Sequence, residues 1–308
     1  MTDLAVIIVS YNVHDLLAPC LESVLASKGV SCDVCVVDNA SADGSAAMVA
    51  ERFPAVRLIR SPVNGGFSYA NNLALRALGF DQPAAGAAGG YRHALLLNPD
   101  TQAPPDALAR AVAYQDAHPG IGVLGAKLVR QDGSLDPACR RSFPTPAVSC
   151  YRMLGLSRLF PRSRRFGRYN LTYLDPDATA DVDAVAGAFM LVRREAIQQA
   201  GLLDERFFMY GEDLDWALRI KARGWRVVYH PAVTVLHVKR GSSRRSRLRT
   251  TREFYRSMLL FYRKHYARQT FFLLDWLIVA AIQLRGGLAY GVNRLALLMS
   301  RPRPGAAG

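Results

Sequence analysis

Residues 4–12 read Leu-Ala-Val-Ile-Ile-Val-Ser-Tyr-Asn, six apolar residues followed directly by three polar ones. A short run rich in Val and Ile, apolar on both faces, is typical of a strand buried inside a parallel sheet. Similar runs occur at residues 32–37, 56–59 and 93–97. The pattern predicts buried strands that end in side chains able to hold a ligand.

Helical patterns lie between these strands. Leucines and other apolar residues recur at helical spacing in residues 14–27, 43–52 and 68–78, and Pro104-Pro105 opens a further helix that runs through Tyr114. Strands that alternate with helices predict the α/β class, with a doubly wound, mostly parallel sheet and helices on both faces. Such sheets bind ligands at the carboxyl ends of their strands.

The second half of the chain is less regular. Residues 137–183 are rich in Pro and Arg, with one helix expected near 148–159, and we interpret them as an insertion that faces the substrate. A strand is expected at 185–192, and two separate strands at 226–229 and 233–236.

Composition excludes several classes of protein. The chain has 308 residues, 50% of them hydrophobic, and a formal net charge of +14, which excludes a disordered or fibrous chain and a disulfide-bonded mini-protein. The charge is concentrated in residues 239–308, which hold 15 Lys and Arg against 2 acidic residues. A nucleic-acid binder would spread its cations over the folded module, so we expect no nucleic-acid partner.

The five cysteines are odd in number, and the Cys32/Cys35 pair lies in an apolar run without a second pair to complete a zinc site. We therefore expect buried thiols and a reducing compartment. The six-residue apolar run after Asp3 has no basic start, so no signal peptide is expected.

Polar residues follow each predicted strand of the first half. They are Ser10-Tyr11-Asn12, Asp38-Asn39, Asn64-Gly65-Gly66 and Asn98-Pro99-Asp100. Each alone is an ordinary turn former. Together, at one edge of a sheet, they predict a site for a ribose, a base or a metal ion. No Gly-rich dinucleotide motif follows the first strand, which disfavours an NAD-type pocket.

Three carboxylates, Glu212, Asp213 and Asp215, fall within four residues. They can simply cap a helix. Helical spacing places Glu212 and Asp215 on one face and Asp213 elsewhere, and the crowding should raise at least one pKa or require a nearby cation. Asp100 and His237 each follow a strand and carry donors that suit a divalent cation, although each type is more often structural when alone.

The set of motifs resembles the inverting family 2 glycosyltransferases of the GT-A fold over roughly residues 4–266. The segments that carry the resemblance are Val9-Ser10-Tyr11-Asn12, Val37 to Ser45, Asn64-Gly65-Gly66-Phe67 with Asn71-Asn72, Leu97-Asn98-Pro99-Asp100, Gly187-Ala188-Phe189-Met190 and Glu212-Asp213-Leu214-Asp215-Trp216. Asp132-Gly133-Ser134 with Arg140-Arg141, and residues 254–266, are similar to a rhamnosyltransferase-like branch that builds bacterial cell-surface polysaccharides.

The resemblance implies a role for each matching residue. Binding of the nucleotide-sugar donor, which is dTDP-, UDP- or GDP-linked, is implied for Ser10, Asn12, Asp38, Asn39, Asn64, Gly65, Asn72 and Asp100. Asp100 and His237 are the implied ligands of Mg²⁺ or Mn²⁺; Asn98-Pro99-Asp100 keeps only one carboxylate of the family's Asp-x-Asp motif. Asp213 is the implied general base, and Glu212, Asp215 and Trp216 would shape the acceptor and donor-sugar side.

The implied reaction explains these residue types. An acceptor hydroxyl attacks the anomeric carbon from the side opposite the leaving diphosphate, so a base is needed on one side and positive charge on the other. Lys239 or Arg240 could assist the metal there. Direct displacement inverts the anomeric configuration. A polyprenyl-linked or glycan acceptor is expected.

The basic tail divides the chain into a catalytic domain, residues 1–240, with nucleotide- and acceptor-binding halves that meet at residue 120, and a helical amphipathic extension, residues 241–308. Residues 271–284 are nearly all apolar, but 14 residues with Asp275 among them are too few to cross a bilayer. We expect docking on a membrane surface, with a homodimer interface and internal packing as alternatives. The expected location is the inner, cytoplasmic face of the cell membrane, peripherally bound.

Two other functions stay open at this point. One is a catalytically inactive GT-A-like protein that binds membranes or nucleic acid through its basic tail. The other is a nucleotidyltransferase, which is disfavoured because Ser10-Tyr11-Asn12 is not the Gly-rich basic loop that such enzymes usually carry after the first strand.

Overall fold

A computed structural model of the chain describes residues 2–82, 90–238 and 247–299. Lys239 and Arg240, which we expected to assist the metal, lie outside the described residues.

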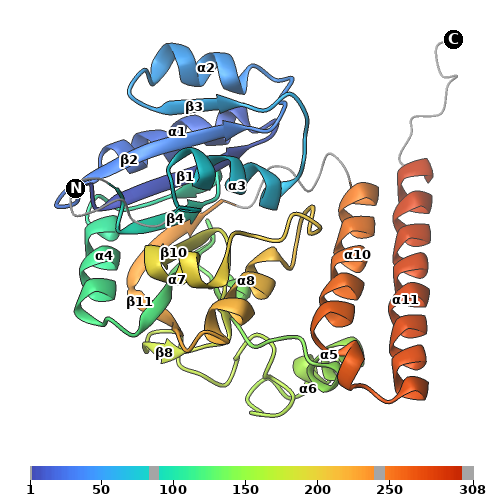
Figure 1. Ribbon diagram of the computed structural model, residues 1–308. Coiled ribbons are helices and arrows are strands. Elements are labelled where there is room, and N and C mark those ends of the chain that lie inside the picture. Colours follow the sequence, from blue (N-terminus) through green and yellow to red (C-terminus); the bar gives the residue numbers. More distant parts are fainter. Residues whose placement is uncertain (1, 83–89, 239–246, 300–308) are drawn as a thin grey trace, which may run out of the picture.

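A single large sheet forms the centre of the protein (Figure 1). Its strand order is β3-β2-β1-β4-β10-β6-β11-β5, and β8 pairs with β11. The strands are β1 (Leu4–Ser10), β2 (Cys32–Asp38), β3 (Arg57–Arg60), β4 (His93–Leu97), β5 (Thr101–Gln102), β6 (Ile121–Val129), β8 (Ala180–Asp181), β10 (Phe189–Arg193) and β11 (Arg226–His237). A separate two-stranded sheet pairs β7 (Arg140–Arg141) with β9 (Ala184–Val185).

The first four strands in the chain are parallel, as predicted. β1 pairs with β2 and β4 on its two sides, and β2 pairs with β3. Every residue of β1 and β4 is buried, which explains why both strands are apolar without alternation. The carboxyl ends of these strands therefore meet at one edge of the sheet.

The other half of the sheet is mixed. β10 lies antiparallel between β4 and β6, whereas β6 and β11 are parallel. The prediction of two separate strands at 226–229 and 233–236 was wrong, because β11 is continuous from Arg226 to His237. Its pairing with β6 shifts register between His230 and Thr234, around Pro231, and such an irregularity lets a strand continue past a residue that has no N–H.

Helices cover the large sheet. They are α1 (His14–Leu25), α2 (Ser45–Arg52), α3 (Phe67–Ala77), α4 (Ala107–Ala117), α7 (Arg194–Ala200) and α8 (Glu212–Lys221). The helix expected near 148–159 is instead two short helices, α5 (Pro146–Met153) and α6 (Leu156–Leu159). Gly155, at φ +76°, separates them, because this left-handed conformation ends a helix. A short 3₁₀ turn, η1 (Pro137–Cys139), precedes β7.

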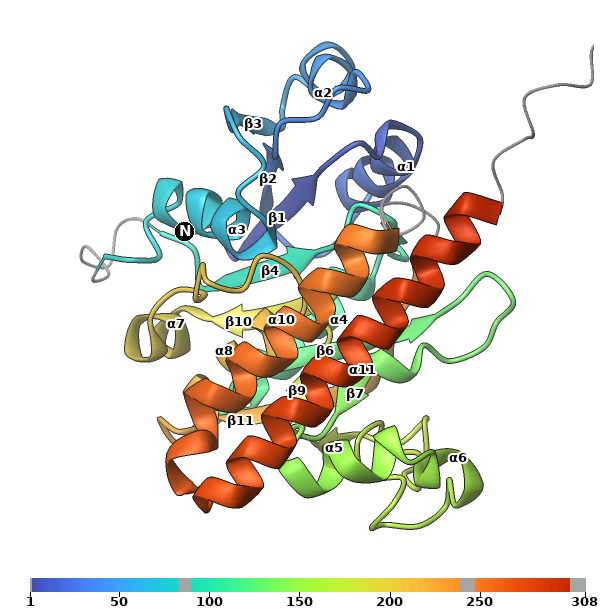
Figure 2. The ribbon, with the colours of Figure 1, turned by 90° about the vertical axis from the view of Figure 1, so that its right-hand side faces the viewer.

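Two long C-terminal helices stand side by side along one flank of the sheet domain (Figures 1 and 2). They are α10 (Arg247–His265) and α11 (Phe272–Met299), joined by η2 (Ala267–Gln269). α10 is tied to α8, since Asp215 Oδ1 lies 2.7 Å from His265 Nε2 and 2.6 Å from Lys264 Nζ. The C-terminal helices therefore pack against the helices that cover the sheet.

α11 is longer than the sequence led us to expect. The apolar run does not stop at Leu284, because the helix continues through Arg285-Gly286-Gly287. Gly286 sits against the Tyr255 ring of α10, where an added Cβ would lie 3.0 Å from the ring, so the glycine lets the two helices approach closely. By length and composition, the 26 residues Phe272–Leu297 could cross a membrane, so the expectation that this segment is too short was wrong.

Candidate active site

The carboxyl ends of the strands surround a cavity of about 610 Å³. The sequence-predicted residues that line it are Asn12, Asn39, Asn64, Asp100, Glu212, Asp213 and His237. Four of them follow strands β1 to β4, His237 is the last residue of β11, and Glu212 and Asp213 begin α8. The fold thus brings together the polar strand ends and the acidic cluster, which lie far apart in the sequence.

Asparagine side chains connect the loops along one wall of this cavity. Asn39 Nδ2 donates to Asn64 Oδ1 at 3.0 Å, and Asn39 Oδ1 accepts from the Gly65 N–H at 3.1 Å. Asn12, at φ +53°, accepts from the Ala42 N–H at 2.8 Å. These bonds hold the loops after β1, β2 and β3 in fixed relation, which preorganises the wall for a ligand.

Other residues that the resemblance assigned to the donor lie behind that wall. Ser10, Asp38 and Asn72 are buried and do not line the cavity. Ser10 Oγ and Asp38 Oδ1 have no hydrogen-bond partner among the described residues, so two buried polar atoms remain available at the strand ends. Asn72 instead supports the backbone at Leu203, with bonds in both directions.

The Asn64-Gly65-Gly66 loop touches the segment just before the acidic cluster. Gly66 has φ +93°, and a Cβ there would lie 2.4 Å from the carbonyl oxygen of Phe208. The next residue, Phe67, donates its N–H to that same oxygen at 2.7 Å. Only glycine permits this approach. Gly65 does not line the cavity, and its space is filled by the Tyr69 ring.

Asp100 and His237 meet at another wall. Asp100 Oδ1 lies 3.3 Å from His237 Nε2, and His237 Nδ1 lies 3.0 Å from Asp136 Oδ2. Burial lowers the pKa of His237, but hydrogen bonds with Asp100 and Asp136 outweigh it and raise the pKa to about 9. A carboxylate that orients a histidine from behind is the usual arrangement around a metal-ligating imidazole.

The arrangement fits a divalent cation. No group of three His, Cys, Asp or Glu side chains arranged to hold a metal occurs within residues 2–82, 90–238 and 247–299. Asp100 and His237 would supply two ligands, and Mg²⁺ and Mn²⁺ sites commonly take the remaining ones from substrate phosphates and water. The donor set therefore suits a metal that binds together with a diphosphate.

Asp213, the second residue of α8, lines the cavity. Its Oδ2 accepts from Arg141 Nη2 at 2.5 Å and from the Gly187 N–H at 3.1 Å, while Oδ1 accepts from the Leu214 N–H at 2.8 Å. Each carboxylate oxygen has two lone pairs, so Oδ1 can still accept a further proton donor. Asp213 is thus a fixed carboxylate with room for a ligand hydroxyl.

Glu212 shares the cavity with Asp213. Burial, and then the Asp213 charge, raise the pKa of Glu212 well above its usual value. Its Oε2 is buried and has no partner among the described residues. Crowding thus has both expected consequences, a raised pKa at Glu212 and a cation, Arg141, beside Asp213.

Asp215, three residues after Glu212 on α8, does not line the cavity that Glu212 and Asp213 share. Asp215 is fully buried and is held by Arg219, Lys264 and His265. Trp216 is also fully buried, with its Nε1 donating to the Gly201 carbonyl at 2.8 Å. Neither lines the strand-end cavity. Lys264 and His265 of α10 thus hold the Asp215 carboxylate in a buried ion-pair cluster outside the cavity.

The sequence did not reveal the side chains that hold Asp213 and His237, which are Arg141 and Asp136. Arg140-Arg141 was noted only as part of a motif, and Asp136 was not singled out. Asp136 follows the Asp132-Gly133-Ser134 turn, which folds back so that Leu135 bridges Val129 at the end of β6. Recognition of that turn as a hairpin would have placed Asp136 beside the carboxyl end of β11 and hence beside His237.

Among the cysteines, Cys20, Cys35 and Cys139 are buried as expected, whereas Cys32 is half-buried. Cys150 on α5 is exposed, which contradicts the expectation for that thiol.

The fold places a cavity at the strand ends and sets the Asp213 carboxylate in its wall. Residues 2–256 match the model of the glycosyltransferase-like family 2. The chain belongs to this family, and it is a nucleotide-sugar-dependent glycosyltransferase.

The most similar relatives include an N-acetylglucosaminyl-diphospho-decaprenol L-rhamnosyltransferase of Mycobacterium tuberculosis, 31% identical over 98% of this chain and 97% of that protein. Rhamnosyltransferase WbbL of Escherichia coli is 43% identical over 56 residues, 18% of this chain and 21% of that protein. Mannosyltransferase PcManGT of Pyrobaculum calidifontis, solved with GDP-Man and Mn²⁺, has a TM-score of 0.56 at 21% identity, over 99% of this chain and 79% of that one. The structural match confirms the predicted GT-A-like fold.

Proposed function

We propose that this enzyme transfers L-rhamnose, with inversion, from a nucleoside-diphosphate donor to a glycan carried on a polyprenyl diphosphate, in the synthesis of a cell-surface polysaccharide. The observation that carries the proposal is the 31% identity to a decaprenol-linked L-rhamnosyltransferase along almost the whole of both chains. Family membership favours a working transferase over an inactive binding protein or a nucleotidyltransferase.

In the proposed reaction the acceptor hydroxyl attacks the anomeric carbon of the donor sugar. Asp213 takes the hydroxyl proton as the new C–O bond forms, and the bond from the anomeric carbon to the diphosphate breaks with its electron pair on the leaving oxygen. Arg141 and the Gly187 N–H hold the Asp213 carboxylate in one orientation. Such fixed orientation favours reaction because the base need not be ordered during the step.

The donor occupies the strand-end cavity in this proposal, with its nucleoside against the Asn12, Asn39 and Asn64 wall. A divalent cation held by Asp100 and His237 would neutralise charge on the diphosphate. Asp136 keeps His237 oriented toward that position.

The outer face of α11 supports a membrane location. Its exposed apolar side chains include Trp276, Leu284, Leu288 and Val292. α11 packs along α10, a helix rich in Arg, so we propose that the pair lies in the plane of the membrane interface, rather than crossing the bilayer, at the cytoplasmic face.

Product analysis tests the function. Purified enzyme, with Mn²⁺ or Mg²⁺ and an N-acetylglucosaminyl-diphospho-polyprenol acceptor, is offered dTDP-rhamnose, UDP-sugars or GDP-mannose, and the glycolipid is analysed by mass spectrometry and NMR. We expect a deoxyhexose adduct with inverted anomeric configuration, formed only with dTDP-rhamnose. Transfer of another sugar would overturn the donor assignment, and a retained configuration would overturn the displacement mechanism.

A further inference from the structure

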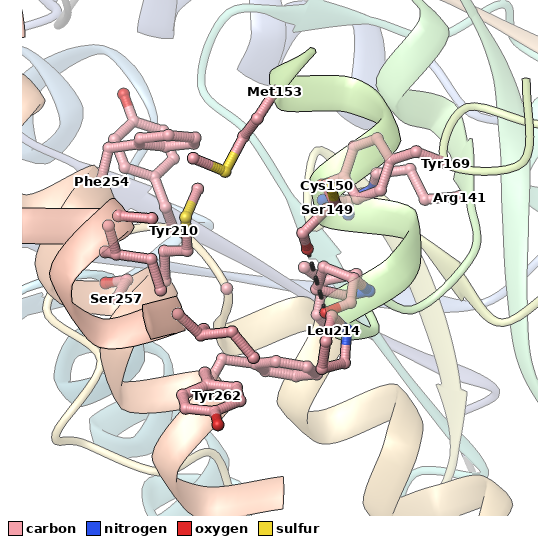
Figure 3. Close-up of a pocket in the computed structure, with 18 of the residues that line it drawn as sticks. Arg141, Ser149, Cys150, Met153, Tyr169, Tyr210, Leu214, Phe254, Ser257 and Tyr262 are labelled. Carbon is pink, nitrogen blue, oxygen red and sulfur yellow. Dashed lines mark hydrogen bonds between the residues drawn. The ribbon is translucent and has the colours of Figure 1, made fainter. Parts of the chain in front are cut away.

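A second cavity, of about 410 Å³, lies between α5, α10 and α11 (Figure 3). Its walls are mostly apolar. α5 contributes Cys150 and Met153, α10 contributes Phe254 and Met258, and α11 contributes Ile278 and Ala281. Figure 3 shows Met153 and Cys150 on α5 facing Phe254 and Ser257 on α10 across the open space.

The two cavities meet at the candidate base. Arg141, Tyr210, Glu212 and Asp213 line both of them. A molecule that occupies the second cavity therefore ends beside Asp213, on the side away from the Asn12, Asn39 and Asn64 wall. That is the position from which an acceptor must present its hydroxyl.

Three hydroxyl groups in the walls of this cavity are already engaged. Ser149 Oγ donates to the Pro144 carbonyl, Ser257 Oγ donates to the Met209 carbonyl at 2.9 Å, and Tyr262 donates to Asp275 Oδ1 at 2.8 Å. A sugar buried among these three groups and the apolar side chains of α5, α10 and α11, away from the Asp213 end, would lose hydrogen bonds to water without replacing them, which is unfavourable. An apolar chain has no such cost.

Cations flank the cavity at its outer walls. The exposed Arg152 guanidinium stacks 4.1 Å from the centroid of the Tyr169 ring, and Arg285 Nη1 donates to the Met153 carbonyl at 3.0 Å. Both Tyr169 and Met153 line the cavity. Exposed guanidinium groups beside an apolar cavity suit a ligand that joins an apolar chain to phosphate groups.

We infer that this cavity receives the isoprenoid chain of the acceptor, in the units nearest its diphosphate. The inference rests on the proposed function, since that function supplies a polyprenyl acceptor. The cavity is continuous with the site at Asp213, is flanked by cations, and has α11 as one wall, so a lipid can enter it from the interface in which the outer face of α11 lies.

Protection of a thiol tests the inference without glycosyl transfer. Cys150 is exposed and lines the cavity, and the half-buried Cys32 on β2 serves as the reference thiol in the same sample. The rate of maleimide labelling is followed by mass spectrometry with farnesyl diphosphate or with inorganic diphosphate. At a concentration about ten times its Kd, farnesyl diphosphate should slow labelling of Cys150 about tenfold, because only the free protein reacts. Cys32 should label at an unchanged rate, and inorganic diphosphate should protect neither thiol.

A matched pair of variants locates the binding. A281F fills the cavity, whereas G287F adds the same ring on α11 where an added Cβ meets no atom within 4 Å. A281F should abolish protection of Cys150, and G287F should keep it. Unprotected Cys150 in the wild type, or equal protection in A281F, would overturn the inference. Because labelling requires no turnover, a wrong donor or acceptor sugar would leave this result intact, and rhamnosyl transfer without protection would overturn the cavity assignment alone.

Discussion

Arg141 Nη2 lies 2.5 Å from Asp213 Oδ2, and the two side chains are only 10% and 11% exposed. The pair links β7 to the start of α8, two segments that are 72 positions apart in the chain. Arg141 also donates to the Val185 carbonyl at 2.9 Å, so its position is fixed by β9 independently of Asp213. The guanidinium therefore sets where the carboxylate can point.

Replacement of Asp213 by Asn tests the base. The amide keeps a similar shape and can still accept from Arg141, but it cannot take a proton, so transfer should fall by about 10²–10⁴-fold. Binding of the nucleoside diphosphate, measured by calorimetry, should be unchanged. E212Q is the matched control and should keep most of the activity. Full activity of D213N would show that another group takes the proton.

The stability of the protein should depend on Glu212 as pH rises. Burial, and then the charge of Asp213, raise the pKa of Glu212 to about 8 in the folded protein. The folded state therefore holds a proton that the unfolded chain releases near its ordinary pKa of about 4.3. The stabilisation from that proton is complete below the unfolded pKa and is lost as pH rises through the folded one.

E212Q isolates this contribution. Between about pH 5 and pH 9 the melting temperature of the wild type should fall relative to that of E212Q, which carries no ionisable group there. The difference between the two curves cancels the other titrating groups. Parallel curves would mean that Glu212 is not held protonated in the folded protein.

Metal binding should depend on Asp136, a residue placed behind the ligand. Asp136 is 1% exposed and its Oδ2 lies 3.0 Å from His237 Nδ1, so it orients the imidazole toward Asp100. Loss of such a partner typically weakens metal affinity by about 10–100-fold. D136A should show this loss when Mn²⁺ binding is measured by electron paramagnetic resonance in the presence of dTDP. H230A, which alters a half-exposed histidine beside Thr179 instead, should bind Mn²⁺ normally. Unchanged affinity for Mn²⁺ in D136A would show that metal binding does not depend on the orientation of His237.

Most of the first half of the fold could be predicted from sequence, because β1 and β4 are wholly buried and therefore read as unbroken apolar runs. The direction of a strand leaves no such signal. β10 is as apolar as β4, yet it runs antiparallel to it. Its orientation depends on contacts with β6 that lie more than sixty residues away in the chain.

The candidate site was predictable where a residue follows a strand, as with Asn39, Asp100 and His237. The site was not predictable where charged residues from a distant part of the chain determine which contacts a side chain makes. The spacing of Glu212 and Asp215 favoured one shared face, but Lys264 and His265 of α10 pair with Asp215, which does not line the cavity that Glu212 lines. Periodicity describes an isolated helix and contains no information about which neighbour brings a cation.

The contact between Gly66 and Phe208 should matter for the donor. Gly66 and Gly44 both have positive φ, at +93° and +85°, so alanine at either position should cost about 1–2 kcal/mol of backbone strain. Only at Gly66 would the added Cβ also meet backbone, 2.4 Å from the Phe208 oxygen. G66A should therefore be the less stable variant in urea unfolding, and it alone should bind dTDP more weakly. Equal losses of stability and of dTDP binding in G66A and G44A would show that the contact with Phe208 contributes to neither.

The outer face of α11 should bind the protein to anionic membranes. Leu284 and Leu288 are 68% and 63% exposed, and a spacing of four residues puts them on the same side of the helix. Apolar side chains gain by entering the interface, and each nearby Arg adds about 1 kcal/mol with anionic lipid. The wild type should therefore sediment with phosphatidylglycerol vesicles, less so with phosphatidylcholine, and binding should weaken with salt because the charge contribution is screened.

The double variant L284E/L288E should lose vesicle binding while it keeps activity toward a short-chain acceptor in detergent. L25E, which adds a carboxylate at a leucine of α1 that is 45% exposed, is the matched control and should bind vesicles like the wild type. Analytical ultracentrifugation without lipid tests the competing explanation. The face would be a subunit interface if the wild type is a dimer that does not bind vesicles and L284E/L288E is a monomer. The same exposed apolar area would then be covered by a second copy of α11 rather than by lipid.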